Sequence, residues 1–340
     1  MLKKTKNFVK LETRDSYIWN LNEKIIEIIK TAISTDDNIY IDTNNEGPCL
    51  YSCGLYNKLD LICNTFGFDK QQFVIYTPNV EEKHDTYKIV IKDNIWINLC
   101  KKNNFNSHCS IKKSQLKTVG CFVGKINWAR AAVLSWLDHY PDKALITCHY
   151  EYSNDDSNLT NQSCLQLNDN FLKFPNELGS ISDFLMTCPR TLPTNFKIPY
   201  STEKATLQKI IDIAVNFSEG YSDIFTELVC ETYFTGFTFF PTEKTFRPIM
   251  QLTPFIIFGP QGFLTNLHRC GFKTFNQYWD ESYDECVGTE RIIKIKQVLT
   301  KLFELDQPAL QKMYNDMRPI LEHNKHRLST LTPKDLLLDE

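Results

Sequence analysis

A carboxylate, Glu46, stands in a turn directly after a predicted strand near the N-terminus. Ile39 and Ile41 alternate as in a strand, and the segment 45–48, Asn-Glu-Gly-Pro, follows them. In open α/β sheets ligands bind at the carboxyl ends of the strands, which is where such a turn lies. Glu46 could therefore take a proton from a substrate hydroxyl as general base. The alternative is an exposed turn or helix-capping glutamate.

Two cations, Lys125 and Arg130, flank the start of the clearest predicted helix. A buried strand over 119–123 leads through a short loop to Asn127, a residue type typical of helix N-caps. The amide groups and dipole at a helix N-terminus already favour an anion. A bound nucleotide pyrophosphate would explain cations at that position, whereas solvated charge at a helix end is the alternative.

A third chemical cluster begins at Thr242, the predicted N-cap of another helix. Glu243, Lys244 and Arg247 lie in its first turns, and Glu231 precedes it at the end of a predicted strand. A carboxylate such as Glu243 can accept hydrogen bonds from ribose hydroxyls, while lysine and arginine neutralise phosphate. Pro248 predicts that this helix is short or kinked.

The elements that must position these residues alternate between strand and helix along the chain. Strands are expected at 39–41, 73–76, 87–91, 95–99, 119–123, 144–148, 224–230, 254–258 and 272–275. Helices are expected at 16–33, 55–63, 128–140, 202–217, from 242, 263–270, 289–304 and 308–327. This alternation predicts an α/β protein with parallel sheets and two Rossmann-like domains.

A basic stretch, residues 101–117, interrupts this rhythm with five lysines and no acidic residue, and predicts the linker between the domains. The predicted organisation is an N-terminal domain over 1–116, a C-terminal domain over 117–315 and a helix and tail over 316–340. A chain of 340 residues fits two domains, since a domain averages about 150.

Composition excludes several function classes. The net charge of -3 provides no global basic field for nucleic acid or anionic membrane. No apolar run approaches the roughly 18 to 20 residues of a membrane span, and residues 1–10 lead into no apolar segment, so we expect a soluble, cytoplasmic protein. The 12 cysteines form no C-x-x-C pairs and are expected to be buried thiols, not metal ligands.

Three segments in the C-terminal half together resemble a known donor-binding motif. They are Cys230–Thr232, Phe240–Pro248 with its Thr-Glu-Lys core, and Thr253–Pro260 with Pro-Phe-Ile-Ile-Phe-Gly. In this order and spacing they are similar to the α1,3/1,4-fucosyltransferase-like glycosyltransferases, whose Phe-Glu-Asn strand, Tyr-x-Thr-Glu-Lys turn and Pro-x-x-x-Gly strand bind the nucleotide sugar.

Two upstream segments extend the resemblance over roughly residues 40 to 305. The segment Cys121–Asn127, with Arg130, stands where the family has a Ser-Asn and arginine element. The segment 45–48 resembles the family's Glu-Asn-Glu-x-Pro segment, which implies that Glu46 is the catalytic base. The resemblance also implies a GT-B fold, in which two Rossmann-like domains face each other across a cleft.

The function implied is inverting transfer of a sugar from a GDP- or UDP-linked donor to a hydroxyl of a glycan, lipid-linked saccharide or other acceptor. The implied donor contacts are Lys125, Asn127, Arg130, Glu231, Thr242, Glu243, Lys244 and Arg247. No further cofactor and no metal are expected, because the D-x-D arrangement of metal-dependent glycosyltransferases is absent. The aromatic loop 233–240 is a candidate floor for a sugar, with core packing as the alternative.

Two other functions stay open at this point. A modified nucleic-acid base could be the acceptor if the lysines of 101–117 held a phosphate backbone, although the acidic net charge disfavours this. The chain could also be a non-catalytic nucleotide-binding or scaffold protein in which Glu46 is only a turn residue. A dehydrogenase is disfavoured because G-x-G-x-x-G is absent, and a serine hydrolase because G-x-S-x-G is absent.

Overall fold

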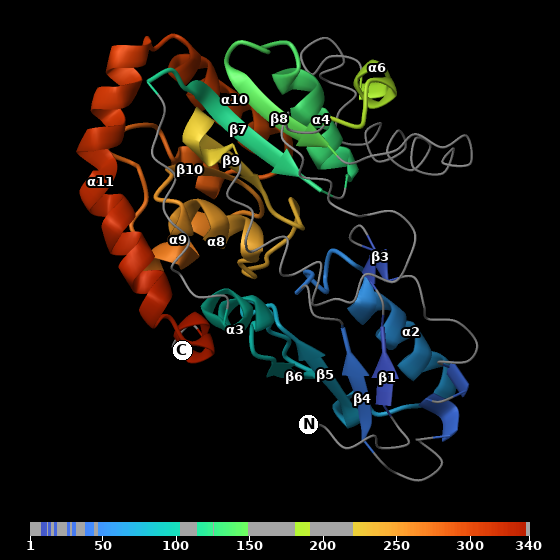
Figure 1. Cartoon of the computed structure of the whole chain (residues 1–340). Helices are drawn as coiled ribbons and strands as arrows, with labels where there is room; N and C mark the ends of the chain where they lie inside the picture. The colour runs from blue at the N-terminus through green and yellow to red at the C-terminus, as the bar shows by residue number, and fades with distance from the viewer. Residues whose placement is uncertain are drawn as a thin grey trace.

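The fold is described by a computed structural model (Figure 1). It describes residues 8–11, 13–14, 17–18, 26–27, 29–31, 38–43, 47–102, 114–124, 126–148, 181–190 and 220–337. Within these ranges the protein is α/β and contains two four-stranded parallel sheets, as the strand and helix alternation predicts. We call the sheet-and-helix units built on them the N-terminal and C-terminal units.

The N-terminal sheet has the order β1-β4-β5-β6, with every neighbouring pair parallel. Its strands are β1 (Phe8–Lys10), β4 (Ile39–Asp42), β5 (Phe73–Thr77) and β6 (Lys88–Ile91). Helix α2 (Leu55–Phe66) connects β4 to β5 and buries Leu55, Leu59 and Ile62 at helical spacing. A small hairpin of β2 (Thr13–Arg14) and β3 (Tyr17–Ile18), and a 3-10 turn η1 (Lys70–Gln72), complete this unit.

The C-terminal sheet has the order β10-β9-β7-β8 and is likewise parallel. Its strands are β7 (Lys117–Val123), β8 (Ala144–Cys148), β9 (Ile224–Cys230) and β10 (Phe255–Phe258). Every residue of β9 and β10 is buried. β10 is apolar throughout and β9 is apolar except for Thr226 and Glu227, because helices cover both faces of a parallel sheet.

Helices and 3-10 turns surround the C-terminal sheet. They are α4 (Trp128–Leu137), α6 (Ile181–Met186), η2 (Tyr221–Asp223), α8 (Glu243–Met250), α9 (Phe263–Arg269), η3 (Ser282–Glu285), α10 (Gly288–Phe303), α11 (Gln307–Thr330) and η4 (Pro333–Leu336). The predicted N-caps are confirmed, because Asn127 accepts a hydrogen bond from the Arg130 amide and Thr242 one from the Lys244 amide. Helix α8 spans eight residues, and so is short, as Pro248 predicts.

Helix α3 (Ile95–Lys102) corrects a sequence prediction and connects the two units. A strand was expected over 95–99, but the Asn94 side chain accepts a hydrogen bond from the Trp96 amide, as helix caps do. Ile97 and Cys100, three residues apart, are buried in the core of the C-terminal unit. The chain before the predicted boundary at 116 therefore contributes to the second core.

The C-terminal end of the chain returns to the same helix. Helix α11 runs along the C-terminal unit, and η4 after it packs against α3 (Figure 1). Residues 272–275, expected as a strand, form none, because the Lys273 amide and carbonyl bond to the Asn324 side chain of α11 in place of a neighbouring strand. The predicted helix over 202–217 lies outside the described residues, as does most of the stretch 101–117. No helix in the described ranges is long and apolar enough to cross a membrane.

Candidate functional site

The carboxyl ends of β7 and β9 bring six of the predicted donor residues together. They are Asn127, Arg130, Glu231, Thr242, Glu243 and Lys244. The cluster is continuous through hydrogen bonds, because the Arg130 guanidinium donates to the carbonyls of Cys230 and Glu231 at 3.1 and 2.9 Å. Glu46 and Lys125, the predicted base and a predicted phosphate ligand, lie outside the described residues.

Glu231 anchors the N-terminus of α8. One carboxylate oxygen accepts hydrogen bonds from the Thr242 amide at 3.2 Å and the Thr245 hydroxyl at 2.6 Å. The other accepts from the Thr242 hydroxyl at 2.8 Å and the Thr232 amide at 3.3 Å. With four donors and 4% exposure, Glu231 is a support for the ligand-facing residues.

Glu243 and Lys244 form the ligand-facing part of the cluster. The Lys244 ammonium lies 3.0 Å from one oxygen of Glu243 and 3.2 Å from the Thr242 hydroxyl. The second Glu243 oxygen is buried and has no hydrogen-bond partner among the described residues. Burial alone would raise the pKa of Glu243, but Lys244 and Arg247 outweigh it and leave that pKa lowered. Glu243 is therefore held in its charged form, with one oxygen paired to Lys244 and the other buried.

Arg247 lies one turn deeper than the rest of the cluster. Its guanidinium is 3.5 Å from a carboxylate oxygen of Glu227, a buried residue of β9 that also accepts a hydrogen bond from the Tyr221 hydroxyl. Burial alone would lower the pKa of Arg247, and Tyr221 and Glu227 raise it above the ordinary value. The structure thus directs Arg247 toward the sheet and leaves Lys244 at its surface end.

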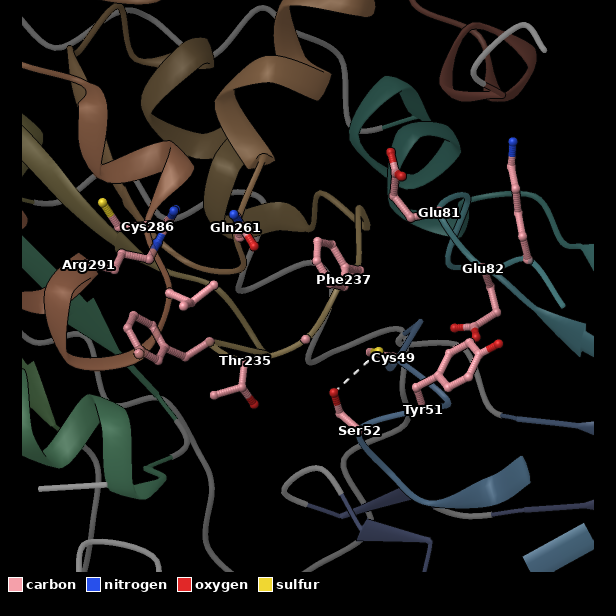
Figure 2. Close-up of a pocket in the computed structure, with 15 residues that line it drawn as sticks. Cys49, Tyr51, Ser52, Glu81, Glu82, Thr235, Phe237, Gln261, Cys286 and Arg291 are labelled. Atoms are coloured by element: carbon pink, nitrogen blue, oxygen red, sulfur yellow. Dashed lines mark hydrogen bonds between the residues drawn. The ribbon is translucent and has the colours of Figure 1, made fainter. Parts of the chain in front are cut away.

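A cavity of about 630 Å³ lies between the two units (Figure 2). One wall is formed by residues 49, 51, 52 and 81–83 of the N-terminal unit, and the other by 234–237, 261, 286–288 and 291 of the C-terminal unit. Tyr51, Phe237 and Val287 line it and are 60%, 66% and 60% exposed. Large apolar side chains exposed together around a concavity are typical of a binding site.

The cavity adjoins the α8 cluster through the loop 231–241. Thr232 approaches the Lys244 ammonium at 3.5 Å, and Phe234, two residues later, already lines the cavity. Phe237 was a candidate sugar contact from the sequence, whereas Tyr51 and residues 81–83 carried no recognisable motif. Residues 279–284 have a packing role, because the Asp284 carboxylate accepts hydrogen bonds from the Leu264 and Thr265 amides at the start of α9.

No group of three or more His, Cys, Asp or Glu residues that could hold a metal ion occurs in the described part of the chain. Comparison of the whole chain with known proteins gives no match among family models, curated proteins or solved structures. Within the described residues, the features that bear on function are the α8 cluster and the cavity that the loop 231–241 lines.

Proposed function

We propose that the chain is a glycosyltransferase that moves a sugar from a nucleotide-sugar donor to a hydroxyl acceptor. The observation that carries the proposal is the arrangement of Glu243 and Lys244 at the N-terminus of α8. A buried, ionised carboxylate with one unpartnered oxygen suits a ribose hydroxyl, and the adjacent ammonium suits a phosphate. The two face the same helix end, whose dipole favours the anion.

The donor diphosphate would lie between Lys244 and the N-terminus of α4, where Asn127 is the N-cap. Arg130 is held by two carbonyl groups and would support this wall. As the bond between the sugar and the diphosphate breaks, Lys244 and the helix amides would stabilise the charge that develops on the leaving group. Because these groups supply the positive charge, the proposed reaction requires no metal ion.

The acceptor would occupy the cavity between the units. Aromatic rings such as Tyr51 and Phe237 offer flat apolar surfaces, while Thr235, Ser52 and Gln261 offer polar groups. The acceptor hydroxyl would attack the anomeric carbon opposite the leaving group, which inverts that centre, and its proton would pass to the base predicted at Glu46. We also propose that the two parallel sheets form the facing domains of a GT-B enzyme.

The experiment that tests this function is nucleoside diphosphate release from a panel of GDP-, UDP- and dTDP-sugars, with and without EDTA. Slow hydrolysis of one donor that EDTA leaves unchanged is the expected result. In Lys244→Ala the nucleotide dissociation constant should rise about tenfold to a hundredfold, since a charge-assisted hydrogen bond contributes about 1.5 to 3 kcal/mol.

Lys312→Ala is the matched control, because Lys312 is exposed on α11 and its ion pair in the described part of the chain is with Asp316 of the same helix. It should leave the dissociation constant unchanged. Release from no donor, with no thermal shift by GDP, UDP or dTDP, would overturn the proposal. Nucleotide binding without release or transfer would instead favour the non-catalytic nucleotide-binding protein.

A further inference from the structure

Two buried polar residues, Asn79 and Glu82, lie where the two units meet. Both follow β5, at the carboxyl edge of the N-terminal sheet, and they are 0% and 5% exposed. Buried polar groups persist only when they are hydrogen-bonded, so their partners indicate what they hold in place. Neither residue carried a motif in the sequence.

The Asn79 side chain uses its complete hydrogen-bonding capacity. Its oxygen accepts from the Glu81 amide at 3.1 Å and from the Phe239 amide at 3.0 Å. Its nitrogen donates to the Phe237 carbonyl at 3.0 Å and to a carboxylate oxygen of Glu82 at 3.1 Å. A carboxamide has two donors and two acceptor positions, and here half of them reach across to the loop 231–241.

Glu82 connects Asn79 to a third segment. The oxygen that accepts from Asn79 also accepts from the Leu50 amide at 3.0 Å, and the other oxygen accepts from the Tyr56 hydroxyl at 2.8 Å. Leu50 lies between Cys49 and Tyr51, two of the residues that line the cavity. In Figure 2 the Glu82 carboxylate points toward Cys49 and Tyr51, away from Glu81.

The pair therefore joins three segments that line the two walls of the same cavity. Segment 49–52 is held through the Leu50 amide, segment 81–83 through the turn at Glu81, and segment 234–237 through the Phe237 carbonyl. Asn79 or Glu82 makes each of these hydrogen bonds itself, and the hydrogen bond between the two residues links all three segments. The distance between the walls depends on this pair more directly than on apolar packing, because hydrogen bonds specify atom-to-atom geometry.

We propose that Asn79 and Glu82 act as one positioning pair that fixes the width of the cavity, and with it the fit of the acceptor. The acceptor part of this inference rests on the glycosyltransferase function proposed above. The pair touches neither the α8 cluster nor any predicted donor contact in the hydrogen bonds given above, so donor binding should be independent of it. Its two members act together, since each orients the other.

The test compares Asn79→Ala, Glu82→Gln and the double variant with Asn94→Ala. Asn94 is the matched control: it is also buried and donates across the interface to the same loop, at 2.9 Å to the carbonyl of Pro241, which does not line the cavity, whereas Asn79 bonds to Phe237 and Glu82, which do. The measurements are hydrogen exchange of the peptides that contain Leu50 and Phe239, nucleotide affinity, donor hydrolysis and transfer to a panel of p-nitrophenyl glycosides.

Asn79→Ala and Glu82→Gln should each raise the KM for the glycoside about tenfold, with nucleotide affinity and donor hydrolysis within twofold of wild type. Each should also accelerate exchange at both peptides. The double variant should be no worse than the more affected single variant, because residues that work as a unit give non-additive effects. Asn94→Ala should accelerate exchange only in the peptide that contains Phe239.

Additive effects of the two variants would overturn the proposal, as would equal losses of hydrolysis and transfer or an equal effect of Asn94→Ala. If Asn79→Ala does not fold, the shape-conserving Glu82→Gln decides the outcome by the same measurements. If the wild type uses no glycoside or nucleotide sugar, the proposed function and the acceptor role both fail. Exchange at the two peptides then still decides whether the pair holds the cavity walls.

Discussion

Replacement of Glu231 by glutamine should weaken both the fold and nucleotide binding. The substitution keeps the shape but turns one acceptor oxygen into an NH2 donor, in a site where four donors converge. In the best orientation the remaining oxygen still accepts from the Thr242 amide and the Thr245 hydroxyl. The new NH2 group then faces the Thr232 amide and the Thr242 hydroxyl, so at least one N–H group loses its acceptor.

The magnitude follows from that loss. A buried donor left without an acceptor costs about 1 to 3 kcal/mol, and 1 kcal/mol lowers Tm by about 2 to 4 °C in a domain of roughly 150 to 250 residues. The expected decrease in Tm is therefore about 2 to 12 °C. The Thr242 hydroxyl, which donates to Glu231, must also rotate its hydrogen away and accept from the new NH2 group, which disturbs its contact with the Lys244 ammonium. We expect about a tenfold weaker nucleotide affinity, or about 1.4 kcal/mol.

Thermal denaturation and nucleotide titration of the same samples measure the two effects. Glu281→Gln is the control, because Glu281 is a half-buried carboxylate that accepts from the Phe275 amide at 2.8 Å and has no contact with the α8 cluster in the described hydrogen bonds. It should lower Tm without changing the affinity. An unchanged Tm in Glu231→Gln would refute the anchoring role, and a lower Tm at unchanged affinity would refute the link from Glu231 to the donor site.

Three further predictions test other parts of the structure. Phe237→Ala should change stability by less than about 0.5 kcal/mol, because the ring is 66% exposed, yet lower transfer to an acceptor; unchanged transfer would remove it from the site. Gly47→Ala should lower the urea midpoint of unfolding more than Gly67→Ala. Both glycines have positive φ, but only a Cβ added at Gly47 would lie 3.0 Å from Phe240, so equal effects would contradict this. The pKa of Asp335 is lowered, first of all by the hydrogen bond from the Thr332 hydroxyl. The charged carboxylate therefore stabilises the folded state above the unfolded pKa of 3.8, and this stabilisation is lost as pH falls through the folded pKa. Asp335→Asn should therefore lower Tm at pH 7, and the difference from wild type should shrink toward pH 3.

Strands β4 to β10 were predictable from the sequence, whereas β1, β2 and β3 were not, and β3 lies where the helix over 16–33 was expected to begin. A parallel strand covered on both faces is mostly apolar, and β10 consists of Phe-Ile-Ile-Phe. Helix α3 was predicted wrongly because Ile95, Ile97 and Leu99 also alternate with period two. The three-residue spacing of Ile97 and Cys100 identifies the helix only once the C-terminal core is known to cover that face.

The residues of the candidate site also differ in whether the sequence alone could reveal them. Thr242, Glu243 and Lys244 are consecutive, and a cap, an acid and a base at one helix start form a local pattern that the sequence displays. Asn79 is different, because its partner Phe239 lies 160 residues away. A lone asparagine before an apolar residue is ordinary in sequence, and only the tertiary structure distinguishes it.

The loop 231–241 connects the donor cluster, the cavity and the residues Asn79 and Asn94. Its first residue, Glu231, is bonded to the start of α8 and so belongs to the donor cluster. Its middle, at Phe237 and Phe239, is held by Asn79 from the other unit, and its end, at Pro241, by Asn94. Because different units hold its two ends, the loop cannot move to widen or narrow the cavity without distorting the hydrogen bonds at one end. The units therefore meet through a loop that lines the acceptor cavity and continues into the helix proposed to bind the donor, so the two proposed sites are connected by covalent chain as well as by proximity.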